Sequence, residues 1–273
     1  MAIDRVEIKD FLVFRDKFAT DFCPGVNVLI GANATGKTTL LKWLYRDEKD
    51  KIGSVVFIPE KDILEHAKGL LTFIEQKQTG FGQIYKDVLI NAQDIPTQVQ
   101  SEIQQKVGKM IVGTIGGEVH WDKGEGSFYT LRTDGTRIPF ASEASGYKKL
   151  GFLGLLITSG RLEKGSILFW DEPENSLNPG LMPVLVDILL ELQRGGVQIF
   201  IATHNSNLAQ LFDVKRTNKD SLLFCNLSKN DAGTIRCDSA ANYTELPKSV
   251  LEDADEALYK AVVAKAMGVN ADE

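Results

Sequence analysis

The segment Gly31–Thr38 reads GANATGKT and fits the pattern G-x-x-x-x-G-K-[ST] in full. It follows the short apolar run Val26–Ile30, which is typical of a buried parallel strand, and it opens a helical segment. In this setting the backbone N–H groups of the loop point at phosphate oxygens, and the helix N-terminus adds positive potential. A chance glycine-rich turn is the alternative, but it would not require all these parts in register. The sequence therefore predicts a phosphate-binding loop.

The residue types of this loop have separate expected roles. The Lys37 ammonium is expected to reach the β- and γ-phosphates of a nucleotide, and the Thr38 hydroxyl to ligate Mg²⁺. The predicted nucleotide-binding residues of this segment are Gly31, Asn33, Ala34, Thr35, Gly36, Lys37, Thr38 and Thr39.

A second apolar run, Ile167–Trp170, ends directly in the adjacent acids Asp171 and Glu172. A P-loop enzyme needs a second acid for Mg²⁺ at the end of a neighbouring buried strand, and Asp171 fits that role. Glu172 is expected to project toward the γ-phosphate, where it would orient the attacking water or take its proton. The alternative is a solvated strand end at which the two acids cap the next turn.

Strand-like and helix-like segments alternate along the chain, which predicts an α/β P-loop fold with a mostly parallel sheet flanked by helices. Short strands joined by KGEG and TDGT predict an antiparallel part between Glu118 and Phe140. An edge strand is expected from Val6 through Phe14. We expect one domain over residues 1–273, with a helical insertion or subdomain at 62–112. The other expected strands are Ser54–Ile58, Val197–Ala202 and Leu222–Asn226, and the other expected helices are Tyr147–Thr158, Leu181–Leu192 and Lys248–Met267.

Composition and charge indicate which classes of partner the chain could bind. The formal net charge is −6 without a block of Lys or Arg, so composition gives no support for a nucleic-acid partner, although a local basic face would still allow one. The three cysteines lack metal-ligand spacing and read as reduced, packed thiols. The N-terminus is charged throughout, unlike a signal peptide, and no apolar run approaches the roughly 20 residues of a membrane span. We expect a cytoplasmic protein with no membrane partner.

The phosphate loop, the Asp171-Glu172-Pro173 triplet and Thr203-His204 after the next strand together resemble the ABC-type ATPases. The resemblance implies ATP and Mg²⁺ as cofactors and His204 as the switch histidine that contacts the γ-phosphate. A structural imidazole is the alternative. Ser176–Pro179 resembles the D-loop, which crosses to the partner subunit in the nucleotide-bound dimer, so Asn178 is expected at that subunit's nucleotide.

Two further segments are similar to family motifs but depart from them. Ser142–Lys149 resembles the L-S-G-G-Q signature, with Gly146 as the later glycine and Ser145 or Ser142 as the hydroxyl that grips the γ-phosphate of the opposite subunit. An ordinary serine N-cap is the alternative. Glu60 follows Ile58-Pro59 at the place of the Q-loop glutamine. It is expected to be a second metal-facing acid, or else only the start of the insertion's first helix.

Details of these motifs favour one branch of the family. The switch reads THN, the D-loop reads SLNP, and the transporter run Q-R-hydrophobic-A-R-A is missing after the signature, as in the RecF, OLD and SMC-like group. Residues 38–142 carry no sustained heptads for an SMC arm, and no paired-acid nuclease set follows His204. The chain thus most resembles stand-alone "AAA family" ATPases that act in genome maintenance, mobile elements or anti-phage defence beside a separate effector.

The leading hypothesis is an ATPase that works as an ATP-dependent dimerisation switch. Two chains would enclose two ATP molecules head to tail, forming a homodimer. Each site would combine Lys37, Asp171, Glu172 and His204 of one chain with Ser145, Gly146 and Asn178 of the other. The alternatives are a nucleotide-dependent scaffold with negligible hydrolysis that holds an effector protein, and the cytosolic ATPase subunit of a membrane transporter.

Overall fold

The computed structural model describes residues 2–75, 82–93, 100–230, 232–247 and 250–267. Its centre is a six-stranded sheet in the order β11-β10-β3-β9-β8-β4. The four neighbouring pairs from β10 to β4 are parallel, and the edge pair β10–β11 is antiparallel. This confirms the predicted α/β fold with a mostly parallel sheet. The strands are β3 (Val26–Ile30), β4 (Val55–Ile58), β8 (Ile167–Asp171), β9 (Gln198–Thr203), β10 (Leu222–Lys229) and β11 (Ile235–Ala240).

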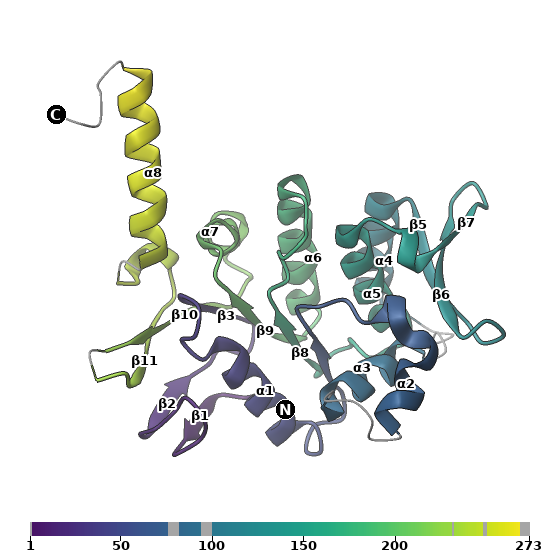
Figure 1. Cartoon of the computed structure of the whole chain (residues 1–273), viewed down its shortest axis with the longest axis horizontal. Helices are drawn as coiled ribbons and strands as arrows, with labels where there is room; N and C mark the ends of the chain where they lie inside the picture. Colours follow the sequence, from purple (N-terminus) through teal and green to yellow (C-terminus); the bar gives the residue numbers. More distant parts are fainter. Residues whose placement is uncertain (1, 76–81, 94–99, 231, 248–249, 268–273) are drawn as a thin grey trace.

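Helices cover both faces of this sheet. Figure 1 shows α1 (Lys37–Glu48) below the sheet and α6 (Met182–Arg194) and α7 (Ser206–Lys215) above it. Every residue of β3, β8 and β9 is buried, as expected for strands with both faces covered. The apolar runs that flank the phosphate loop and the acid pair therefore lie in the core, and their polar continuations meet at one edge of the sheet.

A small antiparallel pair, β1 (Arg5–Ile8) and β2 (Phe18–Asp21), lies beside the sheet. The expected edge strand to Phe14 is wrong in its second half. Phe11 and Phe14 close a tight turn through two 2.9 Å backbone hydrogen bonds, and Asp10 and Leu12 have φ of 52° and 51°. These left-handed residues cannot continue a strand. The turn instead buries the Phe14 ring against Phe18.

Between β4 and β8 the chain forms a group of helices and three further strands. They are η1 (Leu64–His66), α2 (Ala67–Glu75), α3 (Gln83–Ala92), α4 (Glu102–Ile115), the antiparallel strands β5 (Gly117–Asp122), β6 (Ser127–Arg132) and β7 (Arg137–Pro139), then η2 (Phe140–Ser142) and α5 (Ser145–Thr158). The three strands confirm the predicted antiparallel part. α4 packs against α5 and α6, so the helices after β4 join the main body, and a separate subdomain at 62–112 stays a prediction. Residues 76–81 and 94–99 of that span lie outside the described residues.

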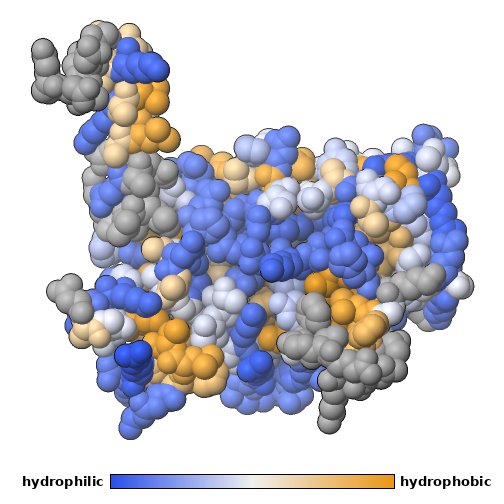
Figure 2. Space-filling model, viewed as in Figure 1, coloured by the Kyte–Doolittle hydropathy of each residue, from blue (hydrophilic) through white to orange (hydrophobic). Residues whose placement is uncertain are grey.

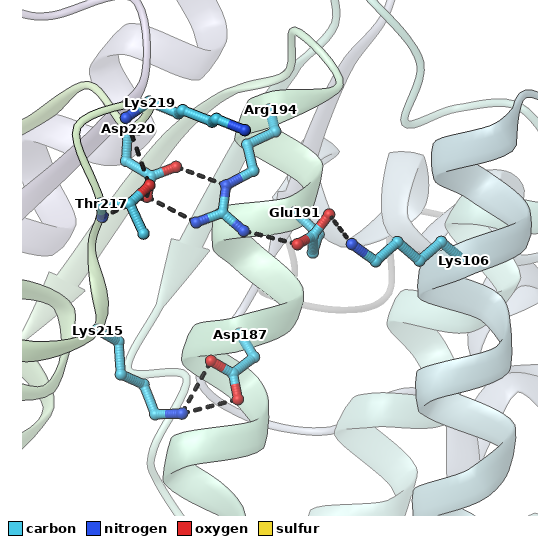
Figure 3. A network of polar contacts seen from close by, with 8 residues as sticks. All are labelled: Lys106, Asp187, Glu191, Arg194, Lys215, Thr217, Lys219 and Asp220. Carbon is cyan, nitrogen blue, oxygen red and sulfur yellow. Dashed lines mark hydrogen bonds and ion pairs between the residues drawn. The ribbon is translucent and has the colours of Figure 1, made fainter.

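A chain of charged side chains fastens α6 to its neighbours (Figure 3). Arg194 donates two 2.7 Å hydrogen bonds to the two carboxylate oxygens of Asp220, in the loop before β10, and a third to Glu191. Glu191 also pairs with Lys106 of α4 at 2.7 Å. Lower on α6, Asp187 pairs with Lys215 of α7. The network ties together three helices and the loop before β10. β10 pairs with β3, the strand that leads into the phosphate loop.

The last described helix, α8 (Val250–Ala266), projects from the body (Figure 1). Leu258, Tyr259 and Val262 are exposed on it, and Figure 2 shows apolar surface beside hydrophilic residues on the part farther from the body. None of the helices in the described part of the chain has the length and apolarity to cross a membrane.

Candidate functional site

The phosphate loop has the backbone of an anion cradle. Gly31, Ala34 and Gly36 have φ of 154°, 62° and 95°, and α1 begins at Lys37 directly after Gly36. A Cβ on Gly31 would lie 2.3 Å from the carbonyl oxygen of Leu227, so only glycine fits beside β10. Among the described residues, no side chain caps the N-terminus of α1. Its first N–H groups thus remain available to an anion.

Lys37 lies folded back over this loop. Its ammonium donates to the carbonyl oxygens of Gly31 at 2.7 Å and Ala32 at 3.0 Å. The side chain is buried, and burial lowers the pKa of Lys37, while the carboxylates of Glu172, Asp171 and Glu174 oppose that shift. A buried cation beside the uncapped N-terminus of α1 makes this the electropositive side of the site.

Thr38 and Asp171 meet although 133 positions separate them. The Thr38 hydroxyl donates a 2.8 Å hydrogen bond to Asp171 Oδ1 at the end of β8. Burial raises the pKa of Asp171, and the Thr38 hydrogen bond opposes it. A hydroxyl and a carboxylate are oxygen ligands of the kind Mg²⁺ prefers, so the residues present fit the predicted ion, and Thr38 with Asp171 would hold it.

Glu172 is next along the chain and turns toward His204. Its φ is 49°, and its N–H donates to the carbonyl oxygen of Ala202 at 2.8 Å, which holds this left-handed residue against β9. Its carboxylate contacts His204 Nδ1. Burial raises the pKa of Glu172 to about 7, and the neighbouring carboxylate of Glu174 adds to the rise, while His204 and Lys37 oppose it.

Glu174 was missed by sequence reasoning. It follows Pro173, accepts the hydroxyl hydrogen bond of Thr203 through Oε1, and is 8% exposed. Its Oε2 has no hydrogen-bond partner among the described residues. The only sign of it in the sequence is the second glutamate of Asp171-Glu172-Pro173-Glu174. An acid in a turn does not by itself indicate a site, and its role became apparent only because β9 lies beside it.

The predicted residues collect around two pockets. The first, about 470 Å³, lies over the phosphate loop, and Glu60, Glu172 and His204 reach it from three separate segments. Glu60 accepts a 2.8 Å hydrogen bond from Asn175. Gly31 and Thr35 belong to the loop but do not line the pocket. The Thr35 hydroxyl donates a hydrogen bond to the carbonyl oxygen of Ala32 within the loop. The pocket is lined by Val13, Asn33, Ala34, Gly36, Lys37, Thr38, Thr39, Glu60, Glu172, His204 and Lys229. Val13 and Lys229 were not predicted.

The second pocket, about 440 Å³, is formed by the start of α5 and the segment after β8. Ser145, Gly146 and Asn178 all line it, and none of them lines the phosphate-loop pocket. Ser145 is the first residue of α5, and Ala144 occupies the N-cap position, so Ser145 is not an ordinary N-cap. Ser142 lies in η2, outside this pocket, so of the two candidate serines of this segment only Ser145 lines it.

Comparisons with known proteins agree with this architecture. Residues 75–209 match a family model described as "AAA domain, putative AbiEii toxin, Type IV TA system". The chain is 26% identical to the arginine transport ATP-binding protein ArtP of Haemophilus influenzae over 193 residues, covering 67% of this chain and 72% of that protein.

Two solved structures share the fold. The SMC head domain from Thermotoga maritima has a TM-score of 0.53 at 12% identity, covering 88% of this chain and 99% of that one. An SMC head bound to the C-winged helix domain of ScpA has a TM-score of 0.58 at 12% identity, with coverages of 89% and 99%. At this identity the likeness concerns the fold.

Proposed function

From the premise that the chain carries an AAA-type P-loop ATPase domain structurally close to SMC heads, we propose that it binds ATP with Mg²⁺, hydrolyses the ATP, and pairs with a second copy while ATP is bound. The observation that carries the proposal is the 2.8 Å contact between Thr38 and Asp171. It joins the phosphate loop to the acidic strand end at one pocket, with Glu172 beside it.

Several residues at the first pocket would then have separate roles in hydrolysis. The start of α1 and Lys37 would hold the phosphates. Bound at Thr38 and Asp171, Mg²⁺ supplies charge neutralisation on the phosphate oxygens. Glu172 would take the proton of the attacking water, since a pKa of about 7 suits a base that works near neutral pH. His204 contacts the same carboxylate and would orient it.

The second pocket supports the dimer. Ser145, Gly146 and Asn178 line a hollow separate from the phosphate loop of their own chain, so they are free to serve the nucleotide of another chain. The start of α5 would present N–H groups there to the γ-phosphate. Because these contacts would exist only in the closed pair, ATP would shift the population toward the dimer.

The biological setting is proposed by analogy. The family description names a putative toxin of a toxin–antitoxin system, and SMC heads share the fold. Both favour a cytoplasmic switch with a separate effector in genome maintenance, mobile elements or anti-phage defence. A transporter subunit is the second candidate, favoured by the 26% identity to ArtP. Co-purification with a membrane protein would select it, and ATP-dependent pairing with negligible turnover would select a scaffold.

The test is light scattering after size exclusion of Glu172→Gln, with and without ATP and Mg²⁺. We expect a monomer that becomes a dimer only with both. Lys37→Ala is the control, because it removes the phosphate contact and is expected to stay monomeric. Turnover of Glu172→Gln at the wild-type rate would overturn the role of Glu172, and absence of ATP binding by the wild type would overturn the function.

A further inference from the structure

Glu172, Glu174 and His204 lie together, and Glu172 and His204 line the first pocket. Each offers one ligand atom, and these atoms lie within 4.8 Å of one another. Ligands bound about 2.1 Å from a metal stand roughly 3–4 Å apart, so small side-chain rotations would close this set around one ion. Thr38 and Asp171, which fit Mg²⁺, do not belong to this set.

Among the described residues, no lysine or arginine forms an ion pair with either carboxylate, and His204 contacts only that of Glu172. Glu172 and Glu174 are 9% and 8% exposed. The two nearby lysines are engaged elsewhere in the described structure: Lys37 donates to the loop carbonyls and Lys149 to the main-chain carbonyl oxygen of Glu172. Buried like charges in proximity are costly unless a proton or a cation lies between them. Glu174 Oε2 is buried and without a partner among the described residues, which is an independent sign of a missing ligand.

The set is held in place as metal ligands usually are. The Thr203 hydroxyl orients Glu174. The backbone of Glu172 is fixed by Ala202 on one side and by Lys149 Nζ at 2.8 Å on the other. His204 is half exposed, so an ion has an entry path from solvent. Such supporting contacts fix the ligand orientation.

We propose that Glu172, Glu174 and His204 form a second cation site that takes a first-row transition-metal dication such as Zn²⁺ or Co²⁺ in the nucleotide-free chain. One imidazole with two carboxylates suits these ions, whereas Mg²⁺ prefers oxygen ligands. The regulatory consequence rests on the proposed function. The ion would engage both the proposed base and its histidine, so it and Mg²⁺-ATP would weaken each other's binding.

The test is titration of the full nucleotide-free chain with Co²⁺, followed by visible absorption, and with Zn²⁺ by calorimetry. Glu174→Gln and His204→Ala are each expected to weaken binding at least tenfold. The matched controls are His66→Ala and His120→Ala. Each of these histidines lies beside one carboxylate, at 3.1 Å from Glu65 and 3.7 Å from Glu118, and both variants should bind as the wild type does.

Unchanged affinity in Glu174→Gln and His204→Ala would overturn the site, as would an intense thiolate-to-cobalt band, which would assign the ion to the cysteines. Thermal unfolding checks that the variants fold. We expect His204→Ala to fold normally, because the side chain that it removes is half exposed. Asp171→Asn separates the two proposals, because it should impair Mg²⁺-ATP binding and leave Co²⁺ binding intact. A wild-type chain that binds Co²⁺ as expected but does not hydrolyse ATP would contradict only the proposed function.

Discussion

The Lys149 ammonium donates a 2.8 Å hydrogen bond to the main-chain carbonyl oxygen of Glu172. Lys149 lies one turn into α5, whose first residues, Ser145 and Gly146, line the second pocket. The bond therefore links the element proposed to serve the partner's nucleotide with the acid proposed to act on the chain's own nucleotide. Burial lowers the pKa of Lys149, opposed by the acids around it.

Lys149→Met should uncouple Glu172 from α5. We expect turnover to fall about tenfold while ATP affinity is kept, because the phosphate-loop contacts are untouched and the lost bond is worth about 1.5 kcal/mol, as for a charged donor. Single-turnover rates and nucleotide titrations measure the two effects. Lys148→Met is the matched control: Lys148 is equally buried on α5 but pairs with Glu65. An equal loss of turnover in that variant would refute the specific role of Lys149.

Thr38→Ala should raise the Mg²⁺ concentration needed for half-maximal turnover about tenfold or more, because it removes one oxygen ligand and leaves Asp171 without its hydrogen bond. Thr38→Ser keeps the hydroxyl and should restore the wild-type Mg²⁺ dependence. A Mg²⁺ titration of the steady-state rate provides the measurement. A Thr38→Ala enzyme with the wild-type Mg²⁺ dependence would show that Thr38 is not a ligand.

Glu172→Gln should stabilise the nucleotide-free protein at pH 8 but not at pH 4. The folded-state pKa of Glu172 is about 7, above its ordinary value of 4.5, so between those values the folded state binds more protons than the unfolded state. The free energy of unfolding contributed by this group therefore falls as pH rises from about 4.5 to 7.

The neutral glutamine removes that loss, on the order of 1–2 kcal/mol after solvent screening. Urea unfolding at the two pH values measures it. Asp134→Asn is a surface control for carboxylate removal, since burial contributes little at that turn. A Glu172→Gln variant that is no more stable than the wild type at pH 8 would mean that the carboxylate is already compensated, for example by a bound cation.

Arg194→Lys should lower the free energy of unfolding by about 1–3 kcal/mol, because lysine cannot make the bidentate contact with Asp220, whose side chain is 0% exposed (Figure 3). Lys215→Met breaks the more exposed pair with Asp187 and should cost less than about 1 kcal/mol. Urea denaturation of both variants makes the comparison. Equal losses would mean that burial of Asp220 does not set the strength of the network.

Local patterns were enough for the parts of the site that lie on one continuous segment. The loop Gly31–Thr38 and the pair Asp171-Glu172 each follow an apolar strand directly, and the carboxyl ends of parallel strands must meet at one edge. That is why the contact between Thr38 and Asp171 could be anticipated from residues 133 positions apart. The edge strand to Phe14 failed because alternation of apolar residues does not reveal the left-handed residues Asp10 and Leu12.

What the sequence by itself determined is the type of fold, the glycine-rich loop before α1 and the acidic strand end, because each depends on the order of residue types along the chain. Only the tertiary structure decided the surroundings of those residues. Glu174 is oriented by Thr203 on β9, and Lys149 hydrogen-bonds to the carbonyl oxygen of Glu172. Lys229 reaches the first pocket because β10 pairs with β3. Burial, a shifted pKa and a shared ligand set are properties of neighbours in space, and strand order brings those neighbours together.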